Sequence, residues 1–370
     1  MWREAGTRPR LAADLCFAIP GDIETLTGGY TYDRRLIAAL RALGWDIHHL
    51  ALGPSFPFPD AGELSLAAGA FAALAARSLV LVDGLAFGAM PGIAAAEGKR
   101  LRLVALVHHP LAEETGLGAA DCAALLESER RALAMTRGVI ATSATTARRL
   151  VQAYGVAPAR LAVARPGSDP VPAIPERSFA RDQAVNLLSV GTLTHRKGHD
   201  LLIEALARLT DLAWTCRIIG SPDRAPAIAD NLRRRIAGHG LQSRILLPGE
   251  AADLAPFYRE ADIFVLASRH EGYGMVFAEA MQQGLPIIAT SAGAIPEAVP
   301  PGAGILVPPE EVEALAAALR RLICDPAERR RYAAGARAAA GSLPLWADTA
   351  RDVADALRRF ANLPLEGEGA

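Results

Sequence analysis

The chain has 370 residues, of which 51% are hydrophobic and 21% charged, and its formal net charge at pH 7 is -1. A chain of this length exceeds what one hydrophobic core holds, so two domains are expected, and the composition excludes a disordered protein. The near-zero net charge gives no reason to expect a nucleic-acid partner. The four cysteines are isolated and lack metal or redox spacing, which predicts buried free thiols in a reducing, cytoplasmic compartment.

Apolar runs in the sequence are short. The longest, such as residues 79–82, fall far below the length that spans a bilayer, and no basic-then-apolar signal precedes the first predicted strand. We therefore expect neither a membrane span nor a secretory signal peptide.

Strands and helices are predicted to alternate through the first half of the chain, as in a doubly wound parallel sheet. The first strand is expected at residues 11–19, followed by Gly28 and Gly29 and then a helix at residues 32–43. Both glycines allow positive φ and a close approach of the backbone to a ligand. Two interpretations stay open, an ordinary turn or contact with a phosphate group. Further strands are expected at 46–52, 78–83, 101–107, 138–143 and 161–164, with helices at 64–77, 92–98, 121–136 and 145–154.

The helix at residues 32–43 carries Arg34, Arg35 and Arg41. A solvated face is the expected role of these arginines, and contact with a membrane surface is the alternative.

Two histidines, His108 and His109, follow the strand at residues 101–107. Open α/β sheets place ligands at the carboxyl ends of their strands, so a histidine here is a better functional candidate than one on a helix face. The alternative is a histidine bonded only to backbone or solvent. We predict His108 as the functional residue, with His109 as the fallback.

A segment with four prolines and few apolar residues, 165–177, predicts an interdomain linker. It divides the chain into a first domain at residues 1–168, a second at 169–344, and a terminal helical segment at 345–370.

The second domain is expected to open with a strand at 185–190, a glycine-bounded loop and a helix at 200–209. The loop holds Arg196 and Lys197, and cations beside helix N–H groups form a strong diphosphate clamp. Of 39 basic residues only Lys99 and Lys197 are lysines, and Lys99 lies in a polar segment typical of the surface. An ordinary surface pair is the alternative for Arg196 and Lys197.

Residues 261–300 combine a predicted strand at 263–266, a polar loop, a helix at 275–283 and a return strand at 285–289. The start of such a helix is an anion site, and the carboxylates of Glu271 and Glu279 flank it. Carboxylates accept hydrogen bonds from sugar hydroxyls, so the pattern suits a phosphate joined to polyols, as in a nucleotide sugar. The predicted donor-binding residues are Gly28, Gly29, Arg196, Lys197, Glu271, Gly272, Tyr273, Gly274, Met275, Val276 and Glu279.

The same segment resembles the signature of the retaining glycosyltransferases of family 4, in which a Glu, seven residues and a second Glu occur in order. The runs EGYG, GLPIIAT and GAIPE stand where that family has them. The resemblance implies the GT-B fold, an α/β architecture of two Rossmann-like doubly wound domains facing a central cleft. The first domain would bind the acceptor and the second the nucleotide sugar, and the terminal helix would cross back to the first.

The resemblance also implies site roles, residue by residue. Lys197 matches a lysine that contacts the diphosphate, and His108 matches a histidine near the donor sugar. Thr192 departs from an arginine that many members have, which leaves open whether Arg196 supplies the second cation. Glu271, His108 and Lys197 are the expected catalytic residues.

The implied reaction is the retaining transfer of a sugar from a nucleotide diphosphate sugar, UDP being the commonest donor in the family. No Asp-x-Asp motif follows a strand and no cluster has metal spacing, so neither a metal nor another cofactor is expected. A nucleotide-sugar epimerase and a non-catalytic scaffold that binds nucleotide sugar are the alternatives. The acceptor class stays open among lipid, saccharide and small molecule, with at most peripheral contact at the inner membrane face.

Overall fold

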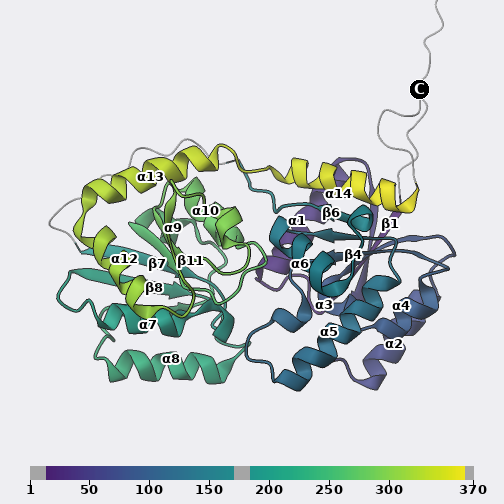
Figure 1. Ribbon diagram of the computed structural model, residues 1–370, viewed down its shortest axis with the longest axis horizontal. Helices are drawn as coiled ribbons and strands as arrows, with labels where there is room; N and C mark the ends of the chain where they lie inside the picture. Colours follow the sequence, from purple (N-terminus) through teal and green to yellow (C-terminus); the bar gives the residue numbers. More distant parts are fainter. Residues whose placement is uncertain (1–13, 171–183, 363–370) are drawn as a thin grey trace, which may run out of the picture.

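The computed structural model describes residues 14–170 and 184–362. Within them the first unit alternates strands and helices, with two short 3-10 turns (Figure 1). Its elements are β1 (Asp14–Pro20), α1 (Gly28–Ala42), β2 (Asp46–Leu52), α2 (Ala61–Ala72), β3 (Leu79–Asp83), α3 (Gly84–Phe87), α4 (Pro91–Glu97), β4 (Arg102–Val107), η1 (Leu111–Glu113), α5 (Ala119–Ala134), β5 (Gly138–Ala141), α6 (Ala144–Tyr154), η2 (Pro158–Arg160) and β6 (Leu161–Val163).

The second unit repeats this alternation and ends in three successive helices. Its elements are β7 (Val185–Val190), η3 (His195–Lys197), α7 (His199–Ala207), β8 (Trp214–Ile219), α8 (Pro226–Gly238), β9 (Ile245–Gly249), α9 (Ala255–Glu260), β10 (Ile263–Leu266), α10 (Met275–Gln282), β11 (Ile287–Thr290), α11 (Ile295–Ala298), β12 (Gly304–Val307), α12 (Val312–Cys324), α13 (Pro326–Ala340) and α14 (Trp346–Ala361).

Each unit is built on a six-stranded sheet. The strand orders are β2-β1-β3-β4-β5-β6 and β12-β11-β10-β7-β8-β9. Neighbouring strands run parallel, for example β3 with β4 from Leu79↔Arg102 to Asp83↔Leu106. In both sheets the chain reverses its direction of winding beside the first strand of the unit, which is where open α/β sheets bind ligands. The predicted α/β class with two doubly wound parallel sheets is confirmed.

The central strands of the first sheet, β3, β4 and β5, are almost wholly buried and largely apolar because helices cover both faces of the sheet there. In β3, Val80 and Val82 face one apolar cluster while Leu79 and Leu81 face another on the opposite side. This alternation follows from the two-residue period of a strand.

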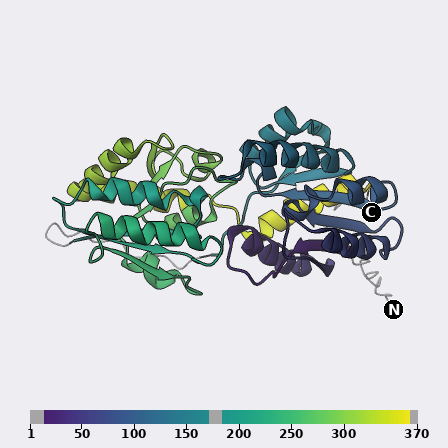
Figure 2. The same cartoon turned by 90° about the horizontal axis from the view of Figure 1, so that it is seen from below.

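Helix α14 belongs to the packing of the first unit although it follows the second in sequence (Figure 2). Val353, Leu357 and Phe360 are buried in the cluster that also contains residues of β1 and α1. The chain reaches this position beside its own linker, since Ser168 N donates to Pro344 O over 2.8 Å. The terminal helix therefore crosses back to the first sheet. The proposed roles of the domains and their exact limits stay predictions.

The packing of α14 predicts a stability effect. Leu357→Ala should lower the free energy of unfolding by about 2–5 kcal/mol, because Leu357 is fully buried and its truncation leaves a cavity. Urea denaturation followed by circular dichroism measures the difference. Asp355→Ala on the exposed side of the same helix is the matched control and should change stability by about 0.5 kcal/mol at most. Equal effects of the two substitutions would contradict this packing.

Some expected boundaries were wrong. Helix α1 begins at Gly28 rather than at residue 32, so Gly28 and Gly29 form its first turn and do not use the positive φ that glycine allows. Helix α2 ends at Ala72, five residues before the expected limit, and its start is fixed by a capping box between Asp60 and Glu63. The short helix α3 was not expected.

Other sequence expectations concern the cysteines and two segments outside the described residues. All four cysteines are free thiols, but only Cys16 and Cys216 are buried and Cys324 is exposed, so the expectation of burial was wrong for Cys324. Residues 11–13 of the first expected strand and 171–177 of the linker lie outside the described residues.

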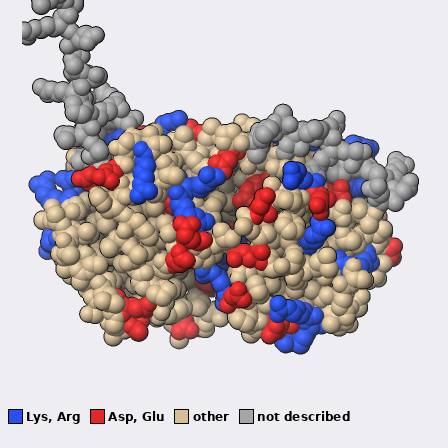
Figure 3. Space-filling model, turned by 180° about the vertical axis from the view of Figure 1, so that it is seen from behind, with Lys and Arg blue, Asp and Glu red and all other residues tan. Residues whose placement is uncertain are grey.

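Surface features give little support for strong binding to a charged partner. Lys and Arg are mixed with Asp and Glu over the face shown in Figure 3. On α1, Arg34 donates to the Thr25 carbonyl over 3.0 Å, Arg41 to the Ile47 carbonyl over 2.9 Å, and Arg35 pairs with Asp169. Among the described residues, no helix is long and apolar enough to cross a membrane.

Candidate active site

The loop that carries Arg196 and Lys197 follows β7 and folds as the 3-10 turn η3. It ends at Gly198, whose φ of +65° is readily adopted only by glycine. A Cβ at this position would overlap the carbonyl oxygen of Ala267, directly after β10. Gly198 therefore lets the Lys197 loop lie against the loop that carries Glu271.

Glu271 is the centre of a buried ionic cluster. Its side chain accepts from Lys197 Nζ over 2.6 Å, from Ser268 Oγ over 2.7 Å and from an Arg196 guanidinium nitrogen over 3.3 Å. The residue is 5% exposed. Although burial alone would raise it, the charges of Lys197 and Arg196 lower the pKa of Glu271 to about 2. Glu271 is therefore a carboxylate at every physiological pH.

Burial and the neighbouring carboxylates act in opposite directions on both cations of the cluster. Burial is the largest effect on Lys197 and lowers its pKa, and the Glu271 carboxylate opposes that effect. The same carboxylate, with Glu114, raises the pKa of Arg196 against its burial. Arg196 thus stands beside Glu271 together with Lys197, whereas the position at which many family members have an arginine is Thr192.

The two units meet at this cluster. Arg196 Nε lies 3.2 Å from Oε1 of Glu114, which follows η1 of the first unit. Glu114 in turn lies 3.4 Å from His109 Nε2. A Cβ at Gly272 would overlap the backbone oxygen of His108. The predicted residues of the two sheet edges are therefore in direct contact.

His108 is held on the first unit by two buried carboxylates. Its Nε2 lies 3.3 Å from Asp33 Oδ1 and 3.4 Å from Asp83 Oδ2. Gly29 is next to the ring, since a Cβ there would lie 3.6 Å from His108 Cδ2. The start of α1 and the end of β4 therefore form one surface.

The remaining predicted donor-binding residues lie at the start of α10 or within it. Gly274 is the N-cap of this helix with φ of +91°. Tyr273 is 6% exposed and packs in the second unit, whereas Met275 contacts apolar clusters of both units. Val276 is partly buried against an apolar cluster of the second unit. Glu279 accepts from Tyr258 OH over 2.8 Å, and burial raises its pKa.

Four residues of the site were not singled out from the sequence: Ser268, Glu114, Asp33 and Asp83. Asp83 ends β3, so the rule that ligands lie at strand ends would have found it. Ser268 stands three residues before Glu271 in a loop already predicted to be polar. Asp33 lies within a helix and carries no sequence signal of its contact with His108.

Residues 14–170 and 184–362 contain two clusters of Asp and His side chains, residue types that also occur in metal sites. They are Asp33, Asp83 and His108, which are largely buried, and Asp14, Asp46 and His48, which are exposed. The expectation that no metal serves the reaction stays a prediction.

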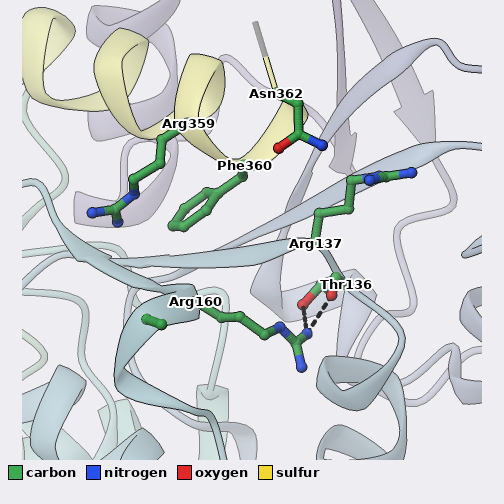
Figure 4. Close-up of a pocket in the computed structure, with 7 residues that line it drawn as sticks. Thr136, Arg137, Arg160, Arg359, Phe360 and Asn362 are labelled. Atoms are coloured by element: carbon green, nitrogen blue, oxygen red, sulfur yellow. Dashed lines mark hydrogen bonds between the residues drawn. The ribbon is translucent and has the colours of Figure 1, made fainter.

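One cavity, of about 460 Å³, lies away from these residues, at the end of α14 (Figure 4). Arg160 is turned toward Thr136 there and donates to its Oγ1 over 2.8 Å. Arg137 and Arg359 point to opposite sides in Figure 4, so their guanidinium groups do not converge on one ligand position. We therefore place the candidate active site at the Glu271 cluster and not here.

Two Rossmann-like units joined at the carboxyl edges of their sheets, with a buried cation–carboxylate cluster at the junction, define the GT-B class. Comparison with known proteins agrees with this assignment to the GT-B class. Residues 26–171 match the family model described as Glycosyltransferase Family 4, and residues 184–325 match the one described as Glycosyl transferases group 1. The chain belongs to glycosyltransferase family 4.

Among curated relatives, a D-inositol 3-phosphate glycosyltransferase of Geodermatophilus obscurus is 36% identical over 231 residues, 58% of this chain and 51% of the relative. A lipopolysaccharide core biosynthesis mannosyltransferase, LpcC of Rhizobium leguminosarum bv. viciae, is 36% identical over 141 residues, 37% of this chain and 40% of the relative. The match thus spans about half the length of the first of these curated relatives.

Solved structures show the same fold at low identity. A sucrose-phosphate synthase from Thermosynechococcus elongatus has a TM-score of 0.77 at 21% identity, covering 93% of this chain and 98% of that one. HepE of Anabaena, in complex with UDP and glucose, has a TM-score of 0.73 at 19% identity, covering 92% and 99%.

Proposed function

We propose that this protein transfers a sugar from a nucleotide diphosphate sugar, with UDP as the expected nucleotide, to an acceptor hydroxyl with retention of configuration. The observation that carries the proposal is the buried cluster of Lys197, Arg196 and Glu271, which lies against His108 of the first unit. Membership of glycosyltransferase family 4 supports it.

In the proposed reaction the cations and the N–H groups at the start of α10 stabilise charge that develops on the leaving diphosphate. The acceptor hydroxyl attacks on the face that the diphosphate leaves, and a phosphate oxygen of the leaving group takes its proton. No protein nucleophile and no divalent ion is used. Contact between the two units would exclude water, which limits hydrolysis of the donor.

Roles follow for the individual side chains. Glu271 binds hydroxyls of the transferred sugar and supports the positive charge that develops on it. His108 hydrogen-bonds the same sugar, and Glu279, already paired with Tyr258, holds the ribose. Gly28 and Gly29, at the start of α1, line the other side of the donor site.

The acceptor class is proposed from the relatives. HepE was solved with UDP and glucose, and several relatives are named D-inositol 3-phosphate glycosyltransferases. These names support a UDP-sugar donor and a saccharide or polyol acceptor. A cytoplasmic location, in keeping with free cysteines, is part of the same proposal.

The proposal is tested first by thermal unfolding with UDP, GDP, ADP or CMP, each with and without EDTA. A nucleotide at 100 times its dissociation constant adds about 2.7 kcal/mol, which raises Tm by several degrees. We expect a shift with UDP that EDTA does not change. No shift with any nucleotide would contradict a nucleotide-sugar site, and a shift abolished by EDTA would contradict the metal-free clamp.

Product analysis then separates transfer from epimerisation. NMR of the donor incubated alone and with an acceptor should show a new glycoside of the same anomeric configuration only when acceptor is present. Conversion of the donor without acceptor would favour an epimerase.

A further inference from the structure

Three elements of the first unit bring charged side chains to one point beside the candidate active site. Asp33 lies on α1, Asp83 ends β3, and His108 follows β4. Because Asp83 is in register with Leu106 of the neighbouring strand, its side chain lies at the same sheet edge as His108. Asp33 is fully buried and Asp83 is 3% exposed, while the His108 side chain keeps 21% of its surface.

The two carboxylates contact the same ring nitrogen. His108 Nε2 lies 3.3 Å from Asp33 Oδ1 and 3.4 Å from Asp83 Oδ2. The other oxygen of Asp83 accepts from Leu85 N over 2.7 Å, which fixes that carboxylate at the start of α3. Nδ1 of His108 makes no hydrogen bond to any residue in the described part of the chain. The ring therefore has Nε2 turned inward and Nδ1 left for a bound molecule.

Packing holds the ring in this orientation. The Tyr32 ring meets the His108 ring edge-on, with centroids 5.1 Å apart at 80°. Thr142 Oγ1 donates to the His108 carbonyl over 3.2 Å. A rotation of the imidazole would therefore separate Nε2 from both carboxylates and disturb the contact with Tyr32.

The surrounding charges favour a protonated ring. The carboxylates of Asp33 and Asp83 raise the pKa of His108 to about 10, more than overcoming the lowering by burial. Burial and the charge of Asp83 raise the pKa of Asp33 to about 7, whereas His108 lowers the pKa of Asp83 against its burial. Tyr30 and Tyr32 are titratable groups nearby, and burial raises the pKa of both above the usual tyrosine value of 10.

We propose that Asp33 and Asp83 are positioning residues that keep His108 as an imidazolium, so that Nδ1–H is a charged donor to an oxygen of the bound nucleotide sugar. This assignment rests on the proposed function and extends it. It makes Asp33 and Asp83, two buried aspartates of the first unit, necessary for the contact between His108 and the donor sugar. A neutral histidine would carry one proton, and with that proton on Nε2 its Nδ1 would be an acceptor.

The first test measures transfer by Asp83→Asn and by Asp33→Asn/Asp83→Asn from pH 6 to pH 8.5. Both replacements keep side-chain size and remove charge. An isolated histidine with a pKa near 6.5 is about three-quarters protonated at pH 6 and about 3% protonated at pH 8. We expect the double variant to lie within about twofold of the wild type at pH 6 and about 20- to 30-fold below it at pH 8. Asp46→Asn is the matched control, since Asp46 and His48 form an exposed pair of the same types, with 3.8 Å between their side chains.

The second test uses the wild-type protein and needs no substrate. In ¹⁵N-histidine NMR, with the His108 signal assigned by its loss in His108→Gln, both ring nitrogens should stay protonated from pH 6 to 9. In the double variant the ring should titrate within this range. This measurement decides the charge of His108 even if the protein proves not to be a transferase.

Three results would overturn the proposal. One is a variant-to-wild-type activity ratio that is the same at every pH, which would indicate a structural role only. Another is a neutral His108 at pH 8 in the wild type. The third is that EDTA treatment abolishes transfer by the wild type and added Zn²⁺ restores it. This result would mean that Asp33, Asp83 and His108 bind a metal cation instead of sharing a proton.

Discussion

Glu271→Gln should reduce the rate of sugar transfer by about 10²–10³-fold, the loss typical of removing one electrostatic contact from a transition state. The carboxylate is the only acidic partner that Lys197 has among the described residues, and it also faces Arg196. A glutamine keeps the size of the side chain but cannot support positive charge on the transferred sugar. Release of the nucleotide from the donor with saturating acceptor measures the effect.

The control for this prediction is Glu313→Gln. Glu313 also pairs with an arginine, Arg208, at 2.7 Å, but its side chain is 77% exposed. It should leave transfer unchanged, because exposed pairs contribute little. Full transfer by Glu271→Gln would contradict the role proposed for Glu271.

The same substitution should also change the dependence of stability on pH. The pKa of Glu271 is lowered from 4.5 to about 2 in the folded protein. Its stabilising contribution is therefore complete above pH 4.5 and is lost as the pH falls through about 2. Glu271→Gln leaves buried Lys197 without its carboxylate and Arg196 with Glu114 alone, and it should cost about 3–5 kcal/mol near pH 7, with a smaller cost in acid. Urea denaturation at several pH values measures the loss of stability near pH 7 and the smaller loss in acid.

Lys197→Met should weaken donor binding and lower transfer, together by about 10²–10³-fold in kcat/KM. Methionine keeps the apolar stem, which passes Gly191 closely, and removes only the charge that faces the diphosphate in the proposed reaction. Lys197→Arg should not restore activity, because the planar guanidinium does not fit a position built for a compact ammonium group. Donor KM and kcat are measured separately.

The sequence itself provides the control, since Lys99 is the other lysine and is exposed. Lys99→Met should behave as the wild type. The double variant Lys197→Met/Glu271→Gln should be little worse than either single variant, because paired residues that act as a unit are not additive. Independent, multiplying losses would mean that the two side chains act on separate steps.

Strand and helix order could be read from the sequence because apolar periodicity is local. Strands β2, β7 and β10 have the limits predicted for them. The start of α1 was predicted less accurately, because its first turn contains Gly28 and Gly29, and glycine favours loops. Tertiary packing of Tyr32, Leu36 and Leu40 on the first sheet stabilises that helix.

For the site, the sequence by itself determined which residues stand in the loops after strands, His108, Lys197 and Glu271, and placed Glu279 inside the helix that follows Glu271. Order along the chain is sufficient for this, because parallel strands bring their carboxyl ends to one edge. Only the tertiary structure decided their partners. It joined Arg196 to Glu271 and Glu114, and Asp33 and Asp83 to His108, pairs 25 to 82 residues apart. Such pairs depend on how helices pack on the sheets and on how the two units meet, which local periodicity does not encode.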